Sequence, residues 1–288
     1  MPSCVSSSCF SHSSDSLRCN PQGGGGYDIH YGVFTNPTTD TVFTSSKETN
    51  TRLLTTLEWF RSFANPQECR ILDLGSGHGG LSHEAAARFH CPVVGCNISP
   101  QQNTMNLQQA QELGLSDLVS VHLLNFNHGL PADWTGTFSH VLSCEVLCHA
   151  ANKEALLGEL FRVLKPGGAL VFTDIMGADD ADEKVLQDFT DRNATTQMAR
   201  PAQYLQQLRT AGFENVSFND FSYPHLELYF GCMLDQIHKH KEEMMADGVP
   251  EAYLDKWIES LTSRVEIQKN HGVFAWGIFA CRKPGPIL

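Results

Sequence analysis

Apolar positions recur with two different spacings along most of this chain. In residues 45–63, Leu53, Leu54, Leu57 and Phe60 share one face at helical spacing, which predicts an amphipathic helix. Further on, short apolar runs predict strands, and helical patterns lie between them. The predicted strands are residues 70–74, 92–97, 119–125, 139–145 and 169–174, and the predicted helices between them are residues 80–89, 100–113 and 153–163. Such alternation is typical of a parallel sheet wrapped by helices.

The pattern changes after residue 200. Residues 201–211 predict a helix and 213–221 a strand, followed by two long helices over 226–247 and 251–269 and a last apolar strand over 272–281. The two long helices have no place in a minimal doubly wound sheet, so we expect them to cap a site. The expected fold class is α/β: a Rossmann-like, seven-stranded, mostly parallel sheet with helices on both faces, an N-terminal lid and a C-terminal helical cap.

These patterns divide the chain into five expected segments. They are a disordered tail over residues 1–26, a lid helix over 27–65, a Rossmann-like core over 66–222, a helical cap over 223–270, and the last core strand with a tail over 271–288. The first segment is rich in Ser, Cys and Gly and cannot bury much apolar surface. We favour a plain flexible tail over a transit peptide, because Arg18 is its only basic residue.

Composition narrows the range of partners. The formal net charge of the 288 residues is −12, and there is no basic run, which argues against nucleic acid and anionic membranes as partners. No uncharged apolar stretch reaches about 18 residues, so we expect no membrane helix and a cytoplasmic protein. Ten cysteines are scattered without a C-x-x-C pair, which favours reduced thiols. His238 and His240 point to different faces of a predicted helix, so we expect no metal site.

A glycine-rich turn follows the first strand of the predicted core. It runs from Asp73 to Gly79 and contains Gly75, Ser76 and Gly77. Glycines let the backbone approach a ligand, and the following helix offers unpaired N–H groups. Enzymes that bind nicotinamide cofactors share the G-x-G pattern. Asp73, however, would repel a pyrophosphate and suits a ligand with a cationic ammonium group; an ordinary strand-to-helix turn is the alternative.

Asn97 ends the second predicted strand of the core, where nucleoside-binding folds usually place an acid against the ribose hydroxyls. Its amide can make the same hydrogen bond without charge assistance, and either Gln101 or Gln102 is placed to add to it. The structural alternative is that Asn97 only caps the following helix.

The next strand ends carry further candidates. Asn125 and Phe126 follow the third strand, near the expected adenine position, although Phe126 suits a core position equally well. Glu145 and His149 follow the fourth strand, so both should project at the carboxyl edge of the sheet, where ligands bind. A Pro-Gly turn at residues 164–168 then leads into the fifth strand.

Together these segments resemble the class I S-adenosylmethionine-dependent methyltransferase superfamily. Residues 73–79 match its first motif, and residues 164–168 match a late motif roughly ninety residues downstream. A closer resemblance, over residues 27–283, is to the sarcosine/dimethylglycine N-methyltransferase group. Residues 29–34, residues 97–103, His149 and the pair Trp276-Gly277 carry that closer resemblance.

The resemblance implies S-adenosylmethionine as the cofactor and a small carboxylate-bearing amine, such as dimethylglycine, as the methyl acceptor. The implied cofactor-binding residues are Asp73, Gly75, Ser76, Gly77, Asn97, Ile98, Gln102, Asn125, Phe126 and Glu145. One position departs from the group: Tyr223-Pro224 stands where the group has an Arg-Pro pair. If that Arg holds a substrate carboxylate, this chain holds it elsewhere or binds another acceptor.

The candidates on the acceptor side are Tyr31, His149, Arg192, Tyr223 and Trp276. Arg192 matches an Arg of the group and is expected, with Arg200 as a second option, to grip a carboxylate. The three aromatic side chains are expected to stabilise the cationic product, and His149 to orient the acceptor or take its proton. A surface position for Arg192 and a core position for Trp276 are the structural alternatives. Residues 27–34 are expected to close over the site.

Several other functions stay open. S-methylation of a methylthio acid, giving a sulfonium osmolyte, is the main competitor: a thioether needs no base, whereas an amine must first lose its proton. C-methylation of a tocopherol-like lipid, an NAD-dependent oxidoreductase and a non-enzymatic binding module are the others. The many charges of the last two helices favour a solvated face over an entry for lipid. The oligomeric state is open, with a homodimer as one option.

Overall fold

The computed structural model describes residues 28, 30–192 and 198–285, without the side chains of residues 188, 191 and 192. The chain divides into two compact units. The larger comprises Asn50–Ser222 and Val273–Leu288, and the smaller comprises Met1–Thr49 and Tyr223–Gly272. The expected tail over residues 1–26 lies outside the described residues. The roles of lid and cap stay predictions.

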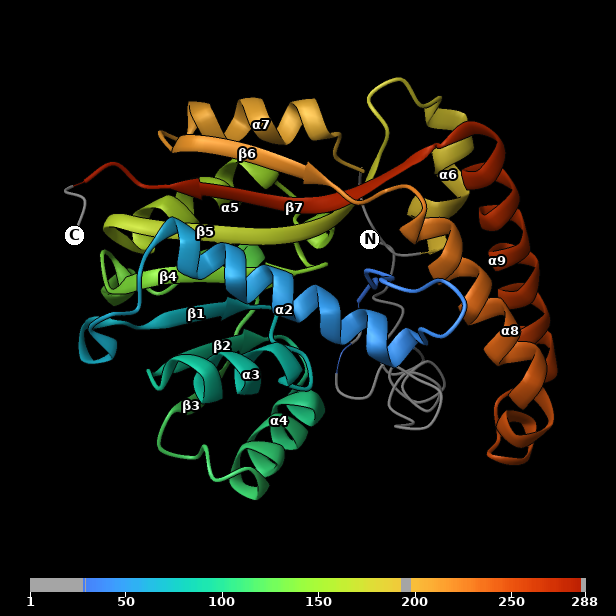
Figure 1. Ribbon diagram of the computed structural model, residues 1–288, viewed down its shortest axis with the longest axis horizontal. Coiled ribbons are helices and arrows are strands. Elements are labelled where there is room, and N and C mark those ends of the chain that lie inside the picture. The colour runs from blue at the N-terminus through green and yellow to red at the C-terminus, as the bar shows by residue number, and fades with distance from the viewer. Residues whose placement is uncertain (1–27, 29, 193–197, 286–288) are drawn as a thin grey trace. The chain divides into compact units, whose positions relative to one another are not determined.

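The described part of the larger unit contains one sheet of seven strands in the order β3-β2-β1-β4-β5-β7-β6 (Figure 1). The strands are β1 (Ile71–Leu74), β2 (Val93–Asn97), β3 (Val119–Leu123), β4 (Phe138–Cys144), β5 (Leu164–Gly177), β6 (Glu214–Asp220) and β7 (Phe274–Arg282). β1 to β5 pair in parallel, and β7 pairs antiparallel with both β5 and β6. The α/β class with a seven-stranded, mostly parallel sheet is confirmed.

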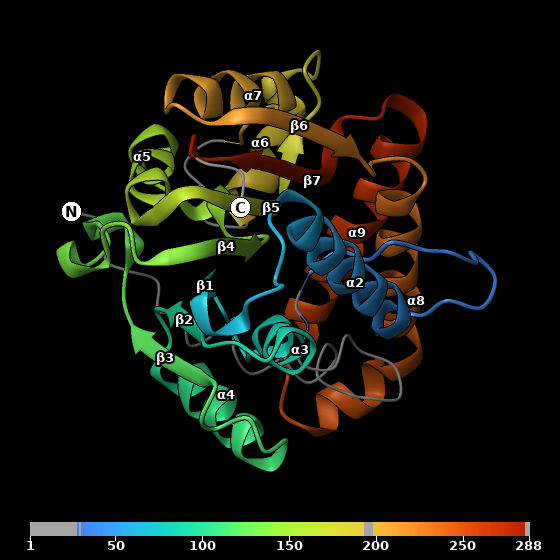
Figure 2. The ribbon, with the colours of Figure 1, turned by 60° about the vertical axis from the view of Figure 1, so that its left-hand side comes forward.

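Helices cover both faces of this sheet (Figures 1 and 2). One face carries α2 (Val42–Phe60), α3 (Gly80–Phe89) and α4 (Pro100–Glu112), and the other carries α5 (Lys153–Val163) and α7 (Pro201–Thr210). Successive strand residues serve opposite faces. In β1, Ile71 packs in the core beneath α2 and α3, whereas Leu72 packs in the core beneath α5 and α7. The two-residue period of a strand therefore lets the sheet bury apolar side chains on both faces.

One helix of the larger unit was not predicted from the sequence. This helix, α6 (Glu183–Arg192), has few apolar positions. Leu186 occupies space left by Gly177, where a Cβ would lie 2.5 Å from the Leu186 Cδ1. The ring of Phe189 lies 5.0 Å from that of Phe274, measured between centroids. Contacts with strand residues therefore stabilise α6, and its Leu186 and Phe189 also share one face at helical spacing.

The strand β5 is longer than predicted and begins at Leu164. Phe138 of β4 pairs with Leu164, and a register shift then brings His140 opposite Ala169. The expected turn at residues 164–168 is therefore an irregularity inside β5, comparable to a bulge. Pairing with β4 before and after this irregularity keeps the Pro-Gly segment in the sheet.

The smaller unit is built on two paired helices, α8 (His225–Ala246) and α9 (Glu251–His271). Lys241 of α8 lies 2.7 Å from Asp255 and 3.3 Å from Glu251, measured from its Nζ to their carboxylate oxygens. These exposed ion pairs link the two helices, and each contributes little to stability because water screens it.

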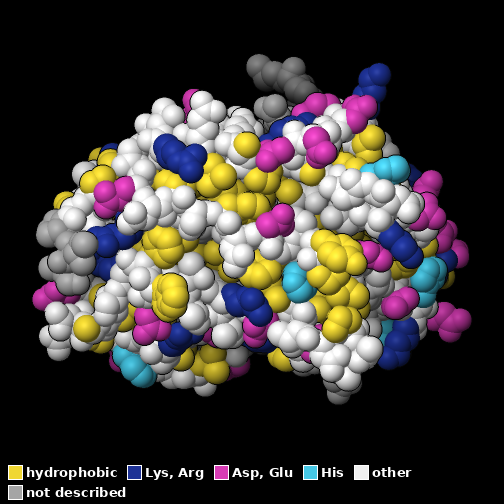
Figure 3. Space-filling model, turned by 45° about the horizontal axis from the view of Figure 1, so that its top comes forward, with side chains coloured by type: hydrophobic (Ala, Val, Ile, Leu, Met, Phe, Trp, Pro, Cys, Tyr) yellow, Lys and Arg dark blue, Asp and Glu magenta, His cyan; other side chains and the backbone are white. Residues whose placement is uncertain are grey.

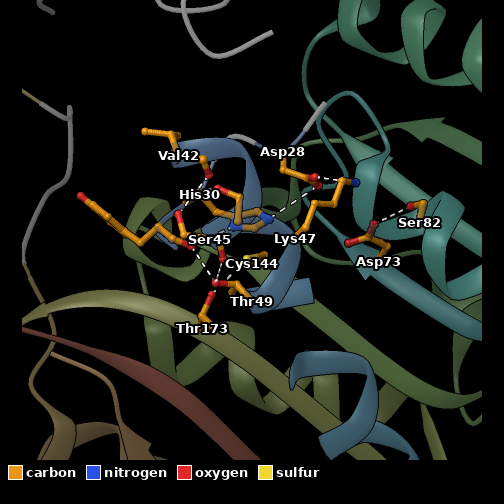
Figure 4. A network of polar contacts seen from close by, with 12 residues as sticks. Asp28, His30, Val42, Ser45, Lys47, Thr49, Asp73, Ser82, Cys144 and Thr173 are labelled. Carbon is orange, nitrogen blue, oxygen red and sulfur yellow. Dashed lines mark hydrogen bonds and ion pairs between the residues drawn. The ribbon is translucent and has the colours of Figure 1, made fainter. Parts of the chain in front are cut away.

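The predicted lid segment lies against α8 within this unit. The Tyr31 ring is 4.8 Å from the Tyr229 ring and 5.8 Å from the Phe230 ring, both in edge-on geometry. The Phe34 backbone N–H donates to Nδ1 of His225 at 3.1 Å. A buried carboxylate, Asp28, also lies 2.8 Å from the Lys47 Nζ (Figure 4). Aromatic, hydrogen-bond and ionic contacts therefore hold the segment that carries Tyr31.

Among the described residues, no helix carries an apolar stretch long enough to cross a membrane. The Lys and Arg side chains form separate patches on the face drawn in Figure 3, with acidic side chains between them. The cysteines in the described part of the chain are free thiols.

Candidate active site

The glycine-rich turn after β1 is held against β2 by its backbone. The N–H groups of Gly75 and Ser76 both donate to the Cys96 carbonyl oxygen, at 2.8 and 3.1 Å. Gly75, Gly77 and Gly79 have φ values of +76°, +50° and +92°. Glycine adopts this left-handed region without the steric cost of a Cβ. The chain can therefore turn sharply from β1 into α3, whose first N–H groups lie at the carboxyl edge of the sheet.

The three glycines of this turn have different surroundings. A Cβ on Gly75 would lie 2.4 Å from Cγ2 of Val146, and one on Gly79 would lie 2.3 Å from Oδ1 of Asn106. Packing within the protein therefore requires both of these glycines. A Cβ on Gly77 would meet no heavy atom within 4 Å. Gly77 is the glycine of the turn that borders open space, and it is the one suited to close approach by a ligand.

Asp73 is buried at the end of β1. Its Oδ2 accepts a hydrogen bond from Oγ of Ser82, in the first turn of α3, at 2.5 Å (Figure 4). The carboxylate thus ties the strand to the helix on both sides of the glycine turn. Ser82 was not among the site residues predicted from the sequence. A hydroxyl residue in the first turn of a helix was the available signal, since such side chains often bond to groups near the helix start.

Ser76 supplies a buried polar atom within the turn. Its Oγ has no hydrogen-bond partner among the described residues. A Cβ on Gly95 of β2 would lie 2.6 Å from this oxygen, so the missing side chain of Gly95 makes room for Ser76. Burying a hydroxyl without a partner costs free energy. A polar ligand that bonds to Ser76 Oγ would remove this cost.

Asn97 ends β2 with its side chain oriented by Gln102. The Asn97 Nδ2 donates to Oε1 of Gln102 at 3.0 Å, so Oδ1 is the atom of the Asn97 amide that can accept from a ribose hydroxyl. The alternative in which Asn97 caps the next helix is wrong, because Ser99 caps α4 and accepts from the Gln102 N–H at 3.3 Å. Ile98 stands between Asn97 and Ser99 in the chain, and 62% of its surface is exposed.

Asn125 and Phe126 follow β3, where we expected contact with adenine. The Asn125 Oδ1 caps the short helix η2 (Phe126–His128) by accepting from the Asn127 N–H at 3.0 Å. Phe126 is partly buried against the core beneath α5 and α7. Both residues therefore have structural tasks, and their contact with the cofactor stays a prediction.

Glu145 follows β4 with a φ of +59°. This conformation costs about 1–3 kcal/mol for a residue other than glycine, and such strain is often found at functional sites. The Oε1 of Glu145 accepts from the indole Nε1 of Trp276, and its backbone N–H donates to the Thr173 carbonyl at 3.1 Å. Trp276 is fully buried in β7. Trp276 therefore orients Glu145 from the core, and a direct role of its ring with the acceptor stays a prediction.

His149 is the last residue of the short helix η4 (Leu147–His149), which follows β4. Burial by the surrounding protein disfavours the charged imidazolium and lowers the pKa of His149, and the nearby Lys153 cation lowers it further. The side chain nevertheless stays partly open to solvent. The imidazole is therefore neutral at neutral pH and able to accept a proton.

The structure places the other acceptor-side candidates in several locations. Tyr31 and Tyr223 belong to the smaller unit, and Tyr223 has 82% of its surface exposed. Arg192 is the last residue of α6, and its side chain lies outside the described residues. Arg200 donates to the backbone carbonyls of two loop residues and lies 2.7 Å from Glu183. The Arg200 guanidinium thus holds its own loop, which argues against it as the carboxylate grip.

Asp174 is a further buried acid near this site, and it was not predicted from the sequence. This fully buried residue of β5 lies opposite Gly277 of β7. Its carboxylate accepts from the Tyr204 hydroxyl at 2.7 Å and from the Cys148 N–H at 3.1 Å. Burial raises the pKa of Asp174 to about 6. An acid at the end of an apolar strand was the available signal, because strand ends of this sheet edge carry functional groups.

Three comparisons with known proteins bear on this site. Residues 65–212 match the family model of a methyltransferase domain. A sarcosine/dimethylglycine N-methyltransferase from Halorhodospira halochloris is 32% identical, over 90% of this chain and 89% of the relative. A dimethylglycine N-methyltransferase from Parasynechococcus marenigrum is 29% identical, over 95% and 94%. A candidate sarcosine dimethylglycine methyltransferase from Galdieria sulphuraria, of known structure, is 24% identical, covers 94% and 98%, and gives a TM-score of 0.83.

S-adenosylmethionine fits the residues around the glycine turn. Gly77 borders open space for it, Ser76 Oγ offers a buried hydrogen-bonding atom, and Asn97 Oδ1 offers an acceptor for a ribose hydroxyl. The matched family model and the relative that is 32% identical over 90% of this chain agree with this fit. The chain belongs to the class I S-adenosylmethionine-dependent methyltransferases and, within them, to the group of sarcosine/dimethylglycine N-methyltransferases.

Proposed function

We propose that this protein transfers a methyl group from S-adenosylmethionine to the nitrogen of a small carboxylate-bearing amine, namely dimethylglycine. One observation carries the choice of acceptor. Dimethylglycine stands in the names of four relatives that align over 90% or more of this chain, whereas sarcosine stands in three of these names. The product would be a trimethylammonium acid, a compound of the osmolyte class.

The residues around the glycine turn would hold the cofactor. Bound S-adenosylmethionine supplies an electrophilic methyl group on its sulfonium. The Gly77 backbone can approach the cofactor closely, and Ser76 Oγ can satisfy its own hydrogen-bonding need there. Gln102 keeps Asn97 Oδ1 available to the ribose. These residues bind and orient, and none of them needs to form a covalent bond.

His149 would prepare the acceptor nitrogen. An ammonium group has no lone pair, so dimethylglycine must lose a proton before it can attack a methyl group. The lowered pKa of His149 keeps its imidazole ready to accept that proton at neutral pH. The transfer is an in-line displacement, so alignment of the reacting atoms at about 3–3.5 Å and exclusion of water supply most of the rate.

A panel of acceptors tests the proposal. The purified protein is incubated with methyl-labelled S-adenosylmethionine and, separately, with glycine, sarcosine, dimethylglycine, a methylthio acid or a tocopherol, and mass spectrometry follows the label. We expect the highest kcat/KM for dimethylglycine, with three methyl groups on the product nitrogen. Transfer to sulfur or to the lipid ring as the preferred reaction would overturn the proposal, and so would cofactor binding without turnover of any acceptor.

The pH dependence of the reaction supplies a second readout. With dimethylglycine, kcat/KM should rise with pH as His149 loses its proton, because only the neutral imidazole can take the proton of the bound ammonium group before the transfer. A thioether has no proton to lose, so kcat/KM for a methylthio acid should not rise with pH for this reason. A flat profile with dimethylglycine would contradict the role proposed for His149.

A further inference from the structure

Two side chains hold the backbone on either side of His149. Asp174 Oδ1 accepts from the N–H of Cys148, the residue before it, at 3.1 Å. Asn127 Oδ1 accepts from the N–H of Ala151 at 2.9 Å, and its Nδ2 donates to the His149 carbonyl at 3.4 Å. Asn127 is exposed, whereas Asp174 is fully buried. The position of His149 therefore depends on one surface contact and one core contact.

The core contact joins three elements of the larger unit. Asp174 belongs to β5, Cys148 to η4, and Tyr204 to α7. The Tyr204 hydroxyl donates to Oδ2 of Asp174 at 2.7 Å, and Tyr204 is itself fully buried in the core. Each carboxylate oxygen thus has its own donor. The ionisable groups around this carboxylate are Tyr204, the Cys148 thiol and Lys153. The charge of Glu145 also raises the pKa values of Tyr204 and of the Cys148 thiol.

Burying a carboxylate at this position costs free energy. Burial raises the pKa of Asp174 to about 6, which shows that the charged form is disfavoured here. An asparagine would have the same shape, would accept from the Cys148 N–H, and would avoid desolvating a charge. A charged acceptor, however, makes a shorter and stronger hydrogen bond than a neutral one. Buried ionisable groups with perturbed pKa values are concentrated at functional sites.

We propose that Asp174 is a positioning residue for methyl transfer: through the Cys148 N–H it holds η4, so that His149 keeps one orientation toward the acceptor. Tyr204 keeps the carboxylate in place. Asp174 touches no reacting atom in this proposal and acts only through the backbone of the turn. The inference rests on the proposed function, in which His149 takes the proton of the acceptor.

A double-mutant cycle tests this inference. The variants Asp174→Ala, His149→Ala and the double variant are compared for kcat and KM with dimethylglycine, and for the Kd of S-adenosylhomocysteine. If Asp174 acts through His149, each single change should lower kcat by about a hundredfold. The double variant should then be as slow as His149→Ala, within about twofold. The Kd of S-adenosylhomocysteine should stay nearly unchanged. Losses that multiply in the double variant overturn the inference.

Two further variants guard against a trivial loss of folding. If Asp174→Ala does not fold, Asp174→Asn takes its place in the cycle, because it keeps the shape and its amide oxygen can still accept, more weakly, from the Cys148 N–H, although its NH2 group cannot accept from the Tyr204 hydroxyl; we then expect about a tenfold loss of kcat. Ser139→Ala is the matched control. Ser139 is also buried, and its Oγ bonds to both the N–H and the carbonyl of Arg70 at the opposite end of β4. The Ser139→Ala variant should be less stable but should keep nearly the parent kcat. Any small loss of kcat that it causes should multiply with the loss caused by His149→Ala.

The cycle separates failure of this inference from failure of the proposed function. An unchanged kcat in His149→Ala shows that the proton acceptor was wrongly assigned, and it overturns both statements. A slow His149→Ala variant whose loss multiplies with that of Asp174→Ala leaves the proposed function in place and overturns only the positioning role.

Discussion

Neighbouring residues of the turn after β1 serve different purposes. Gly75 leaves room for Val146, whereas Gly77 borders open space. Asp73 is committed to Ser82 through a short hydrogen bond, and Ser76 has a buried oxygen beside Gly95. A motif that looks uniform in the sequence therefore combines packing, backbone geometry and ligand binding, and substitutions can separate these three.

The pair Gly77→Val and Gly75→Ala separates binding from packing. Both positions have positive φ, so both variants carry backbone strain. A side chain at Gly77 fills the space open to the cofactor, so Gly77→Val should abolish binding of S-adenosylhomocysteine in a protein that still folds. Gly75→Ala instead collides with Val146 and should lose about 1–3 kcal/mol of stability. Calorimetry and thermal unfolding measure the two effects, and a folded Gly77→Val variant with normal affinity would contradict the assignment.

Asp73→Ala should weaken cofactor binding strongly. The buried turn loses a charged hydrogen-bond acceptor worth about 1.5–3 kcal/mol, which corresponds to about a 10- to 150-fold increase in Kd. Ser82→Ala is the matched control, because it removes the partner hydroxyl and keeps the charge, and it should cost about 1 kcal/mol. Isothermal titration with S-adenosylhomocysteine compares them. Equal affinities in the parent and Asp73→Ala would rule out this role.

Among the elements, the join between β4 and the end of α2 depends on a buried histidine. The His140 Nε2 donates to the Arg61 carbonyl at 3.0 Å, and its Nδ1 lies 2.7 Å from Ser139 Oγ. Its ring stacks on Phe63 with 3.9 Å between centroids. Burial lowers the pKa of His140 to about 3, so the folded protein holds this imidazole neutral.

The protein should therefore lose stability in mild acid through His140. The unfolded chain protonates this histidine below its ordinary pKa of 6.5, whereas the folded chain does so only near 3. Stability present above pH 6.5 is thus lost as the pH falls, at about 1.4 kcal/mol per unit. Between pH 7.5 and 5.0 the loss from this group is about 2 kcal/mol.

Urea unfolding of the parent and of His140→Gln at these two pH values measures this contribution. The variant should be less stable at pH 7.5 and should lose about 2 kcal/mol less on acidification. The comparison of two proteins is needed because Asp174, whose pKa is raised to about 6, acts in the opposite direction. Its destabilising effect disappears as the pH falls from 6 toward the ordinary pKa of 3.8. Identical losses in both proteins would show that His140 is not responsible.

In the whole molecule, the candidates for binding the cofactor and those for binding the acceptor come only partly from the same unit. The cofactor-binding candidates all belong to the larger unit, whereas Tyr31 and Tyr223 belong to the smaller one. Arg192 ends α6, a helix that was not among the predicted elements. We propose Arg192 as the grip for the acceptor carboxylate, because guanidinium and carboxylate form two parallel hydrogen bonds.

Arg192→Ala should raise the KM for dimethylglycine by about 10- to 100-fold, while the Kd of S-adenosylhomocysteine stays nearly unchanged. An analogue without the carboxylate, dimethylethylamine, should lose little further in this variant, because the grip is already absent. Arg209→Ala, in the last turn of α7, is the matched control for the loss of an arginine. If the two acceptors differ as much in the variant as in the parent, another group holds the carboxylate.

Much of the fold was predictable because its signals are local. The bounds of α3 and α5 agree with those predicted from the sequence, and Asn152 caps α5 by accepting from the Ala155 N–H at 3.0 Å. Apolar periodicity and helix caps act within a few residues, so they can be recognised along the chain. The early start of β5 was missed because it depends on pairing with β4, whereas α6 was missed although its Leu186 and Phe189 stand at helical spacing.

By itself, the sequence determined the succession of strands and of most helices along the chain, the glycine turn, and the polar residues that follow the strands. Only the tertiary structure decided which glycine borders open space, that Trp276 orients Glu145, and that Asp174 holds the turn of His149. The hydrogen bond between Trp276 and Glu145 joins residues 131 positions apart, and the two bonds of Asp174 join residues 26 and 30 positions apart. These partners meet because the strand order places β5 between β4 and β7. Periodicity along the chain contains no information about that order, since it arises from packing between elements.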